Sequence, residues 1–208
     1  MNINRLFVVT MCVGTLLAFN EAFAQKEKKA DRGEPTEEEM MKRWKDAATP
    51  GEAHKRLAEM VGSWETESTM WMNGPGSDST ITKGTAEFTM VLDGRFLRQD
   101  ASGEMLGQPM SGIGYTGYDN FKRRYVAVWV DNMGTAMFTM EGTPAADGKT
   151  ITYRGTMDDP MTGEKNKKVK YTETMLDNDS HVFRMYDVTA HGDKQPVLKI
   201  TYRRRKQE

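Results

Sequence analysis

The sequence predicts an all-β protein in which about ten antiparallel strands form a closed meander, preceded by one or two short helices. After Gly62 the hydrophobic pattern changes from a helical period to a period of two, and this period continues to about residue 204. Short polar links separate the apolar runs, and none is long enough for a crossover helix, so neighbouring strands must be antiparallel. Closing such a sheet into a barrel removes its two exposed edges. The alternative is a two-sheet sandwich, which the number of strands does not exclude.

The first 24 residues have the layout of a secretory signal. Arg5 provides the positive charge, residues 6–19 form the apolar stretch, and Ala22-Phe23-Ala24 is a small-x-small cleavage site. We therefore expect a periplasmic or secreted protein. The apolar stretch is too short to span a bilayer, and no later run approaches the roughly 20 residues that a membrane helix needs.

Charge and cysteine content exclude several classes of protein. The chain has 29 basic and 30 acidic residues, and loss of Arg5 and Glu21 with the signal leaves 28 and 29. A near-neutral chain lacks the basic surface that nucleic acids or anionic membranes require. The single cysteine, Cys12, also leaves with the signal, so packing alone must stabilise one domain of roughly 150 residues. The sequence does not define an oligomeric state.

A charged, partly disordered segment is expected between the signal and the barrel. Within it, Thr36 followed by three glutamates is typical of a helix N-cap, and this helix should run through Lys45. A Pro-Gly pair interrupts the pattern before a second short helix over residues 52–60. The predicted organisation is a signal over residues 1–24, the charged segment over 25–50 and the barrel domain over 51–208.

Each predicted strand is an alternating run bounded by turn residues such as Asn, Asp, Gly and Pro. The ten strands are expected over residues 63–72, 80–91, 95–104, 110–118, 124–131, 135–142, 150–156, 167–176, 181–189 and 197–204.

The stretch 115–134 predicts a hairpin with one aromatic face. One face of its first strand carries Tyr125, Ala127, Trp129 and Asp131, and the other carries three valines. We expect the tryptophan face to line the interior, because Tyr and Trp bury more area than valine and offer directed donors.

The turn Asp131-Asn132-Met133-Gly134 allows two registers. A type I turn with a bulge would place Trp129 beside Met137, whereas a tight two-residue turn would pair Trp129 with Ala136. In both registers the carboxylate of Asp131 should accept a backbone N–H group of its own turn.

A ten-strand barrel has more internal space than an eight-strand barrel, which would admit a small, mostly apolar ligand. An equally weighted alternative is that the aromatic residues are core packing with no ligand. Arg95 and Asp131 are candidate polar anchors near the ends of the barrel. The candidate ligand-binding residues are Tyr125, Trp129, Asp131, Phe138, Met137, Arg95 and Tyr115.

The sequence indicates no metal site, cofactor or catalytic motif. His54, His181 and His191 are too far apart for zinc-type spacing. Methionine is frequent, but its spacing is that of strands and its usual role is flexible packing rather than copper binding. Gly112 and Gly114 begin a strand, so they indicate a barrel bend rather than a nucleotide-binding loop.

Several motifs resemble a bacterial family that is known only as a domain of unknown function. The similarity covers residues 55–205 and implies a lipocalin-like barrel without an established activity. Its motifs are Met60-Val61-Gly62-Ser63-Trp64, Leu92-Asp93-Gly94-Arg95-Phe96-Leu97, Gly107-Gln108-Pro109, Gly117-Tyr118-Asp119-Asn120, Trp129-Val130-Asp131-Asn132-Met133-Gly134, Asp159-Pro160-Met161-Thr162-Gly163 and Ile200-Thr201-Tyr202-Arg203.

Gly62-Ser63-Trp64 is also similar to the G-x-W motif of lipocalins. That resemblance implies a structural role for Gly62 and Trp64, with Arg203 or Arg205 stacked on the indole at the closed end. Related small barrels that bind haem use a histidine on the closing strand, and residues 200–202 contain none.

The leading hypothesis is an exported barrel that binds a small, mostly apolar molecule. A structural or protein-interaction barrel without a ligand is the first alternative. The second is a barrel enzyme of isomerase or hydrolase type that uses Asp131, Tyr115 or His181.

Overall fold

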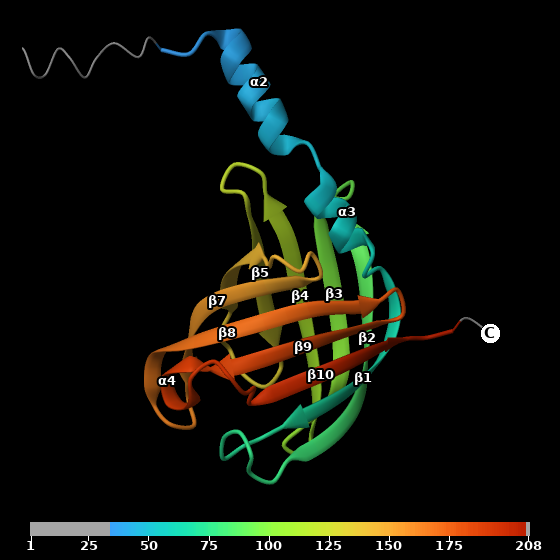
Figure 1. Cartoon of the computed structure of the whole chain (residues 1–208), viewed down its shortest axis with the longest axis vertical. Coiled ribbons are helices and arrows are strands. Elements are labelled where there is room, and N and C mark those ends of the chain that lie inside the picture. Colours follow the sequence, from blue (N-terminus) through green and yellow to red (C-terminus); the bar gives the residue numbers. More distant parts are fainter. Residues whose placement is uncertain (1–33, 207–208) are drawn as a thin grey trace, which may run out of the picture. The chain divides into compact units, whose positions relative to one another are not determined.

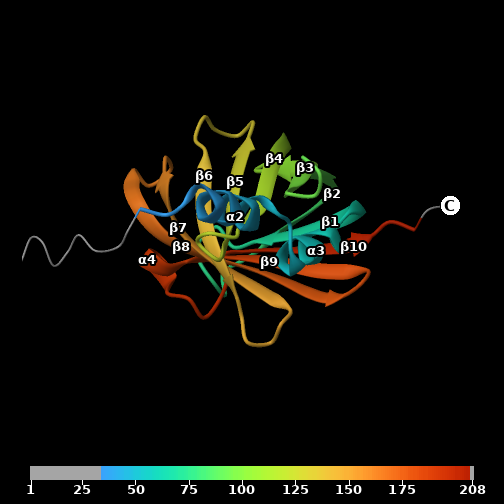
Figure 2. The same cartoon turned by 90° about the horizontal axis from the view of Figure 1, so that it is seen from above.

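The fold was analysed in a computed structural model, which describes residues 34–206. The expected signal and residues 25–33 of the charged segment lie outside these residues. Ten strands form one closed antiparallel barrel in the order β1-β10-β9-β8-β7-β6-β5-β4-β3-β2 (Figures 1 and 2), which confirms the predicted meander and rules out the sandwich. The strands are β1 (Gly62–Met70), β2 (Thr80–Val91), β3 (Phe96–Met105), β4 (Gln108–Asp119), β5 (Arg124–Asp131), β6 (Phe138–Pro144), β7 (Thr150–Asp159), β8 (Glu164–Asp177), β9 (Ser180–Asp187) and β10 (Leu198–Arg204).

Two helices precede the barrel, as predicted: α2 (Glu37–Ala48) and α3 (Glu52–Ala58). Thr36 caps α2 through a reciprocal pair of bonds with Glu39, in which Glu39 N donates to Thr36 Oγ1 at 3.2 Å and Thr36 N donates to Glu39 Oε2 at 3.0 Å. The chain divides into two units between Lys45 and Asp46. Within residues 34–206, no helix has the length and apolar character needed to cross a membrane.

The hairpin between β5 and β6 differs from both predicted registers. Trp129 pairs with Phe138, not with Met137 or Ala136, because residues 132–137 form a six-residue loop. Asp131 nevertheless acts in the turn as predicted, since Met133 N donates to Asp131 Oδ1 at 3.0 Å. The longer loop was hidden because Asp131-Asn132-Met133-Gly134 has the composition of a complete short turn.

The predicted strand 181–189 is also too long. The strand β9 ends at Asp187, whose carboxylate accepts a hydrogen bond from Ala190 N at 2.9 Å and so caps a short helix, α4 (Val188–His191).

The helix α3 lies at one end of the barrel (Figure 1), and we call this end, where Leu57 and Met60 pack, the sealed end. Leu57 and Met60 join the same buried cluster as Trp64, which is completely inaccessible to solvent. Trp64 Nε1 donates to Met60 O at 2.9 Å. The second predicted helix is thereby confirmed, although it ends at Ala58 and not at residue 60.

The arginine that stacks on Trp64 is Arg204. Its guanidinium carbon lies 4.2 Å from the centre of the indole. Arg203 and Arg205, one of which was expected in this place, are both exposed. The pairing explains the difference, because Arg204 lies opposite Trp64 across the β1–β10 seam and its neighbours point to the other face of the sheet.

Candidate functional site in the barrel interior

Strand register defines which side chains face the barrel interior. Residues paired across antiparallel strands share a face. Phe88, in the buried core, pairs with Gln99, and this row continues through Gly114 and Trp129 to Phe138. The tryptophan face of β5 therefore points inward, as the sequence predicted.

Methionine is the most frequent apolar residue on the inward face. Eight methionines occupy inward positions, and each is only half-buried. Phe138 and Phe183, which also face inward, are half-buried as well. Five of these methionines and Phe183 pack against the buried core cluster, and each of the ten side chains keeps some solvent-accessible surface. The eight are Met70, Met90, Met105, Met110, Met140, Met157, Met175 and Met185.

Trp129 is held in place by its own hairpin and by two glycines. Its Nε1 donates to Asp131 Oδ2 at 2.8 Å. A Cβ atom at Gly112 would lie 2.2 Å from the indole, and one at Gly114 would lie 3.1 Å away. The two glycines of β4 therefore provide the space that the indole occupies. The role expected for them from the sequence was a bend in the barrel.

The predicted site residues fall into two groups. Trp129, Asp131 and Phe138 lie together at the end of the barrel opposite α3. Tyr125 shares their face, but it lies towards the sealed end, is 2% exposed and packs against Tyr118 at a ring distance of 5.0 Å. Tyr125 is thus part of the core.

Three other candidates do not line the interior. Met137 is 69% exposed in the loop after β5, and Tyr115 is 40% exposed because it points outward between the inward-facing Gly114 and Thr116 of β4. Arg95 lies in the turn between β2 and β3, where it donates to Leu92 O at 3.2 Å and pairs with Asp93 at 3.7 Å. Turn geometry and strand alternation explain these three corrections.

A buried polar cluster inside the barrel was not predicted. Glu173 Oε1 forms a short hydrogen bond with His181 Nδ1, and the imidazole stacks on Tyr202 with ring centres 4.0 Å apart. Gln99 Nε2 donates to the hydroxyl of Tyr202 at 3.3 Å from β3. The imidazole also meets Trp64 edge-on at 4.6 Å. The cluster thus joins the sealed end to the middle of the interior.

The buried tyrosines near this cluster are neutral. Burial raises the pKa of Tyr171 to about 12. Burial also raises the pKa of Tyr153 and of Tyr202, and the negative charge of Glu173 raises both further. These hydroxyl groups therefore remain protonated at neutral pH and are available as hydrogen-bond donors.

A buried lysine occupies the other end of the interior. Lys167 Nζ lies 2.7 Å from Asp187 Oδ2 and 3.0 Å from Asp159 Oδ2. The hydrogen bond to Asp187 is the main cause that raises the pKa of Lys167, while the bond to Lys167 is the main cause that lowers the pKa of Asp159. This group ties the β7–β8 turn to the end of β9.

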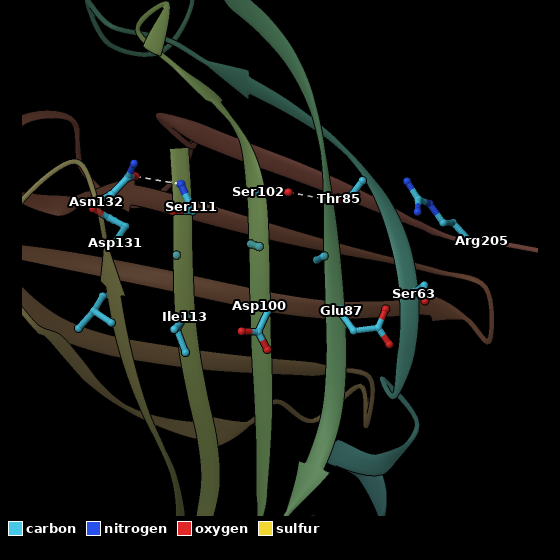
Figure 3. A pocket seen from close by; sticks show the side chains of 14 residues that line it. Ser63, Thr85, Glu87, Asp100, Ser102, Ser111, Ile113, Asp131, Asn132 and Arg205 are labelled. Carbon is cyan, nitrogen blue, oxygen red and sulfur yellow. Dashed lines mark hydrogen bonds between the residues drawn. The ribbon is translucent and has the colours of Figure 1, made fainter. Parts of the chain in front are cut away.

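The outer face of strands β1 to β5 carries a separate groove of about 680 Å³ (Figure 3). Its lining includes short polar side chains that bond to one another, together with Glu87, Arg205 and the apolar Ile113 and Val130. Thr85 and Ser102 hydroxyls are 3.0 Å apart, and Ser111 N donates to Asn132 Oδ1 at 2.9 Å. The polar groups in these bonds already have partners within the protein.

Alternation in β8 was the signal that could have revealed the Glu173 cluster. Val169, Tyr171, Glu173 and Met175 occupy one face of this strand, so a glutamate stands among apolar inward residues. His181, by contrast, gives no sequence signal, because its partner Glu173 is placed by the β8–β9 hairpin. Among residues 34–206, no group of three or more His, Cys, Asp and Glu side chains could hold a metal ion.

Comparison with known proteins assigns the family. Residues 49–204 match the profile of a family described as "Protein of unknown function (DUF1579)", which is well over half of the chain. The protein belongs to the DUF1579 family. The predicted relationship to a domain of unknown function with a barrel is thereby confirmed, and no curated protein matches the chain.

Solved structures similar to this DUF1579 protein show the same fold at low sequence identity. The crystal structure of Rv2717c from M. tuberculosis has 18% identity and a TM-score of 0.54, covering 76% of this chain and 100% of that one. The S-type phycobiliprotein lyase CPES from Guillardia theta has 14% identity and a TM-score of 0.52, covering 84% of this chain and 100% of that one. These similarities support the barrel fold.

Proposed function

We propose that this DUF1579 protein is an exported barrel that binds a small, mostly apolar molecule in its interior. The observation that carries the proposal is the inward face of half-buried methionines and aromatic rings. Thioether side chains are flexible and polarisable, so they adapt to an irregular apolar ligand. Trp129 and Phe138 offer a flat aromatic surface beside them.

The fold comparison is compatible with this role, since one barrel of similar fold is a phycobiliprotein lyase. Export rests on the layout of residues 1–24 and is part of the proposal. Detection of the processed protein in the periplasmic or extracellular fraction of its host, with its new N-terminus near Gln25, would support it.

Native mass spectrometry of protein purified from its own host tests the binding proposal. We expect a co-purifying small molecule, or a thermal shift with members of a lipid and quinone panel. If no ligand co-purifies and no compound shifts the melting temperature, the interior methionines serve only as packing.

Paired variants of β5 locate the site. Ala127 faces inward between Thr116 and Met140, whereas Val128 faces outward. Ala127→Phe should fill the interior and abolish ligand binding, and Val128→Phe should leave it unchanged. Ser102→Phe fills the outer groove instead, so loss of binding in that variant alone would move the site to the outer face. Circular dichroism checks that each variant is folded.

A further inference from the structure

Carboxylates outnumber cations among the charged side chains that the strands direct inward. Lys167 is held between Asp159 and Asp187, so this group carries one net negative charge. Asp131 and Glu173 add two more. The remaining inward cation, Arg204, is stacked over Trp64 at the sealed end and donates to the carbonyl groups of Val61 and Glu59. The inward faces of the strands therefore carry more carboxylates than cations.

Glu173 keeps solvent-accessible surface within its cluster. Its side chain is 15% exposed, whereas His181 is completely buried. Within residues 34–206, the bond to His181 is the only hydrogen bond of this carboxylate, and it uses Oε1. The second oxygen is left to accept another donor, and Phe183 beside it is half-buried.

Burying the Glu173–His181 pair has a cost in stability. His181 Nε2 is buried with no hydrogen-bond partner in the described part of the chain, between Trp64 and Tyr202. A buried ionisable pair is often no more stable than apolar side chains of the same volume. An unsatisfied buried nitrogen therefore calls for an explanation other than stability. The other ring nitrogen of His181, Nδ1, bonds to Glu173 and fixes the direction of its carboxylate.

From these observations we infer that Glu173 anchors a cationic group, and that the interior selects apolar amines over apolar carboxylates. The inference rests on the proposed interior binding site. An ammonium group would pair with the free oxygen of Glu173 while its hydrocarbon chain contacts the methionines. A carboxylate in the same place would bring two like charges together in a poorly solvated site, which is unfavourable.

The test compares decylamine, decanol and decanoate at pH 7, below their micelle-forming concentrations, by calorimetry and tryptophan fluorescence. We expect decylamine to bind about tenfold or more tightly than decanoate. Glu173→Gln should lower the affinity for decylamine to that for decanol and leave decanol binding unchanged. Glu87→Gln, on the outer face of β2, is the matched control and should change none of the three.

Each other outcome has a distinct meaning. Binding of none of the three probes would overturn the proposed function together with the inference. Equal binding of amine and carboxylate, or an amine preference that persists in Glu173→Gln, would overturn the inference alone. Preferential binding of decanoate that is lost in Arg56→Gln would also overturn it, because Arg56 of α3 acts electrostatically on Tyr125 and Tyr153. The wild-type series decides the matter even if Glu173→Gln does not fold.

Discussion

Arg204 stacks on Trp64 and thereby joins the last strand of the barrel to the first. Besides the 4.2 Å contact with the indole, Arg204 Nη1 donates to Val61 O at 2.6 Å and Nη2 donates to Glu59 O at 2.9 Å. One side chain thus satisfies two carbonyl groups at the end of the α3 segment and covers one face of a buried ring.

Trp64→Ala should lower the free energy of unfolding by about 3 kcal/mol or more, as truncation of a fully buried tryptophan usually does. Urea denaturation followed by circular dichroism measures the change. Trp44→Ala is the control, because Trp44 is 67% exposed on α2 and its loss should change stability little. Equal midpoints for the two variants would show that Trp64 is not essential to the sealed end.

Arg204→Ala should destabilise the protein by roughly 1–3 kcal/mol, since it leaves carbonyl groups without donors and uncovers Trp64. Arg203→Ala removes the same charge one residue away and should stay within about 0.5 kcal/mol of wild type. Thermal and urea unfolding of the pair measure the difference. A larger effect at Arg203 would mean that charge, and not the stacked geometry, is responsible.

Gly112→Ala should displace the indole of Trp129, because the new Cβ atom would lie 2.2 Å from the ring. We expect a loss of about 1–3 kcal/mol, typical of overpacking, and a changed near-ultraviolet circular dichroism spectrum. At Gly134 an added Cβ meets nothing within 4 Å, so Gly134→Ala should leave both properties unchanged. An unaltered spectrum in Gly112→Ala would show that Trp129 does not lie against β4.

Acid should weaken the group around Lys167. The pKa of Asp159 is lowered in the folded protein, chiefly by its bond to Lys167, so its stabilising contribution is present above the unfolded pKa. It is lost as the pH falls below about 4 and through the lowered folded value. Asp159→Asn should therefore reduce stability at pH 7 more than at pH 3, measured by urea denaturation at both. Asp93→Asn, at a side chain that is 98% exposed, should show no such pH dependence.

The sequence was sufficient to predict the strands because each strand alternates and each turn carries its own residues. It predicted Trp129 as inward because Tyr and Trp bury more area than the valines on the other face of the strand. It could not predict which residues meet across the barrel: Glu173 with His181, Gln99 with Tyr202, and Arg204 instead of Arg203 on Trp64. Those contacts depend on register and on barrel closure, and a shift of one residue exchanges the two faces of a strand.

The seam between β1 and β10 also has a consequence for how the chain folds. The bond from Arg204 to Val61 joins residues 143 positions apart, and the barrel cannot close until β10 has been synthesised. Closure over so long a loop makes folding slow compared with a protein built from local contacts. A chain that completes its fold only at its last strand keeps its first strand unpaired on one side until nearly the whole polypeptide has been made.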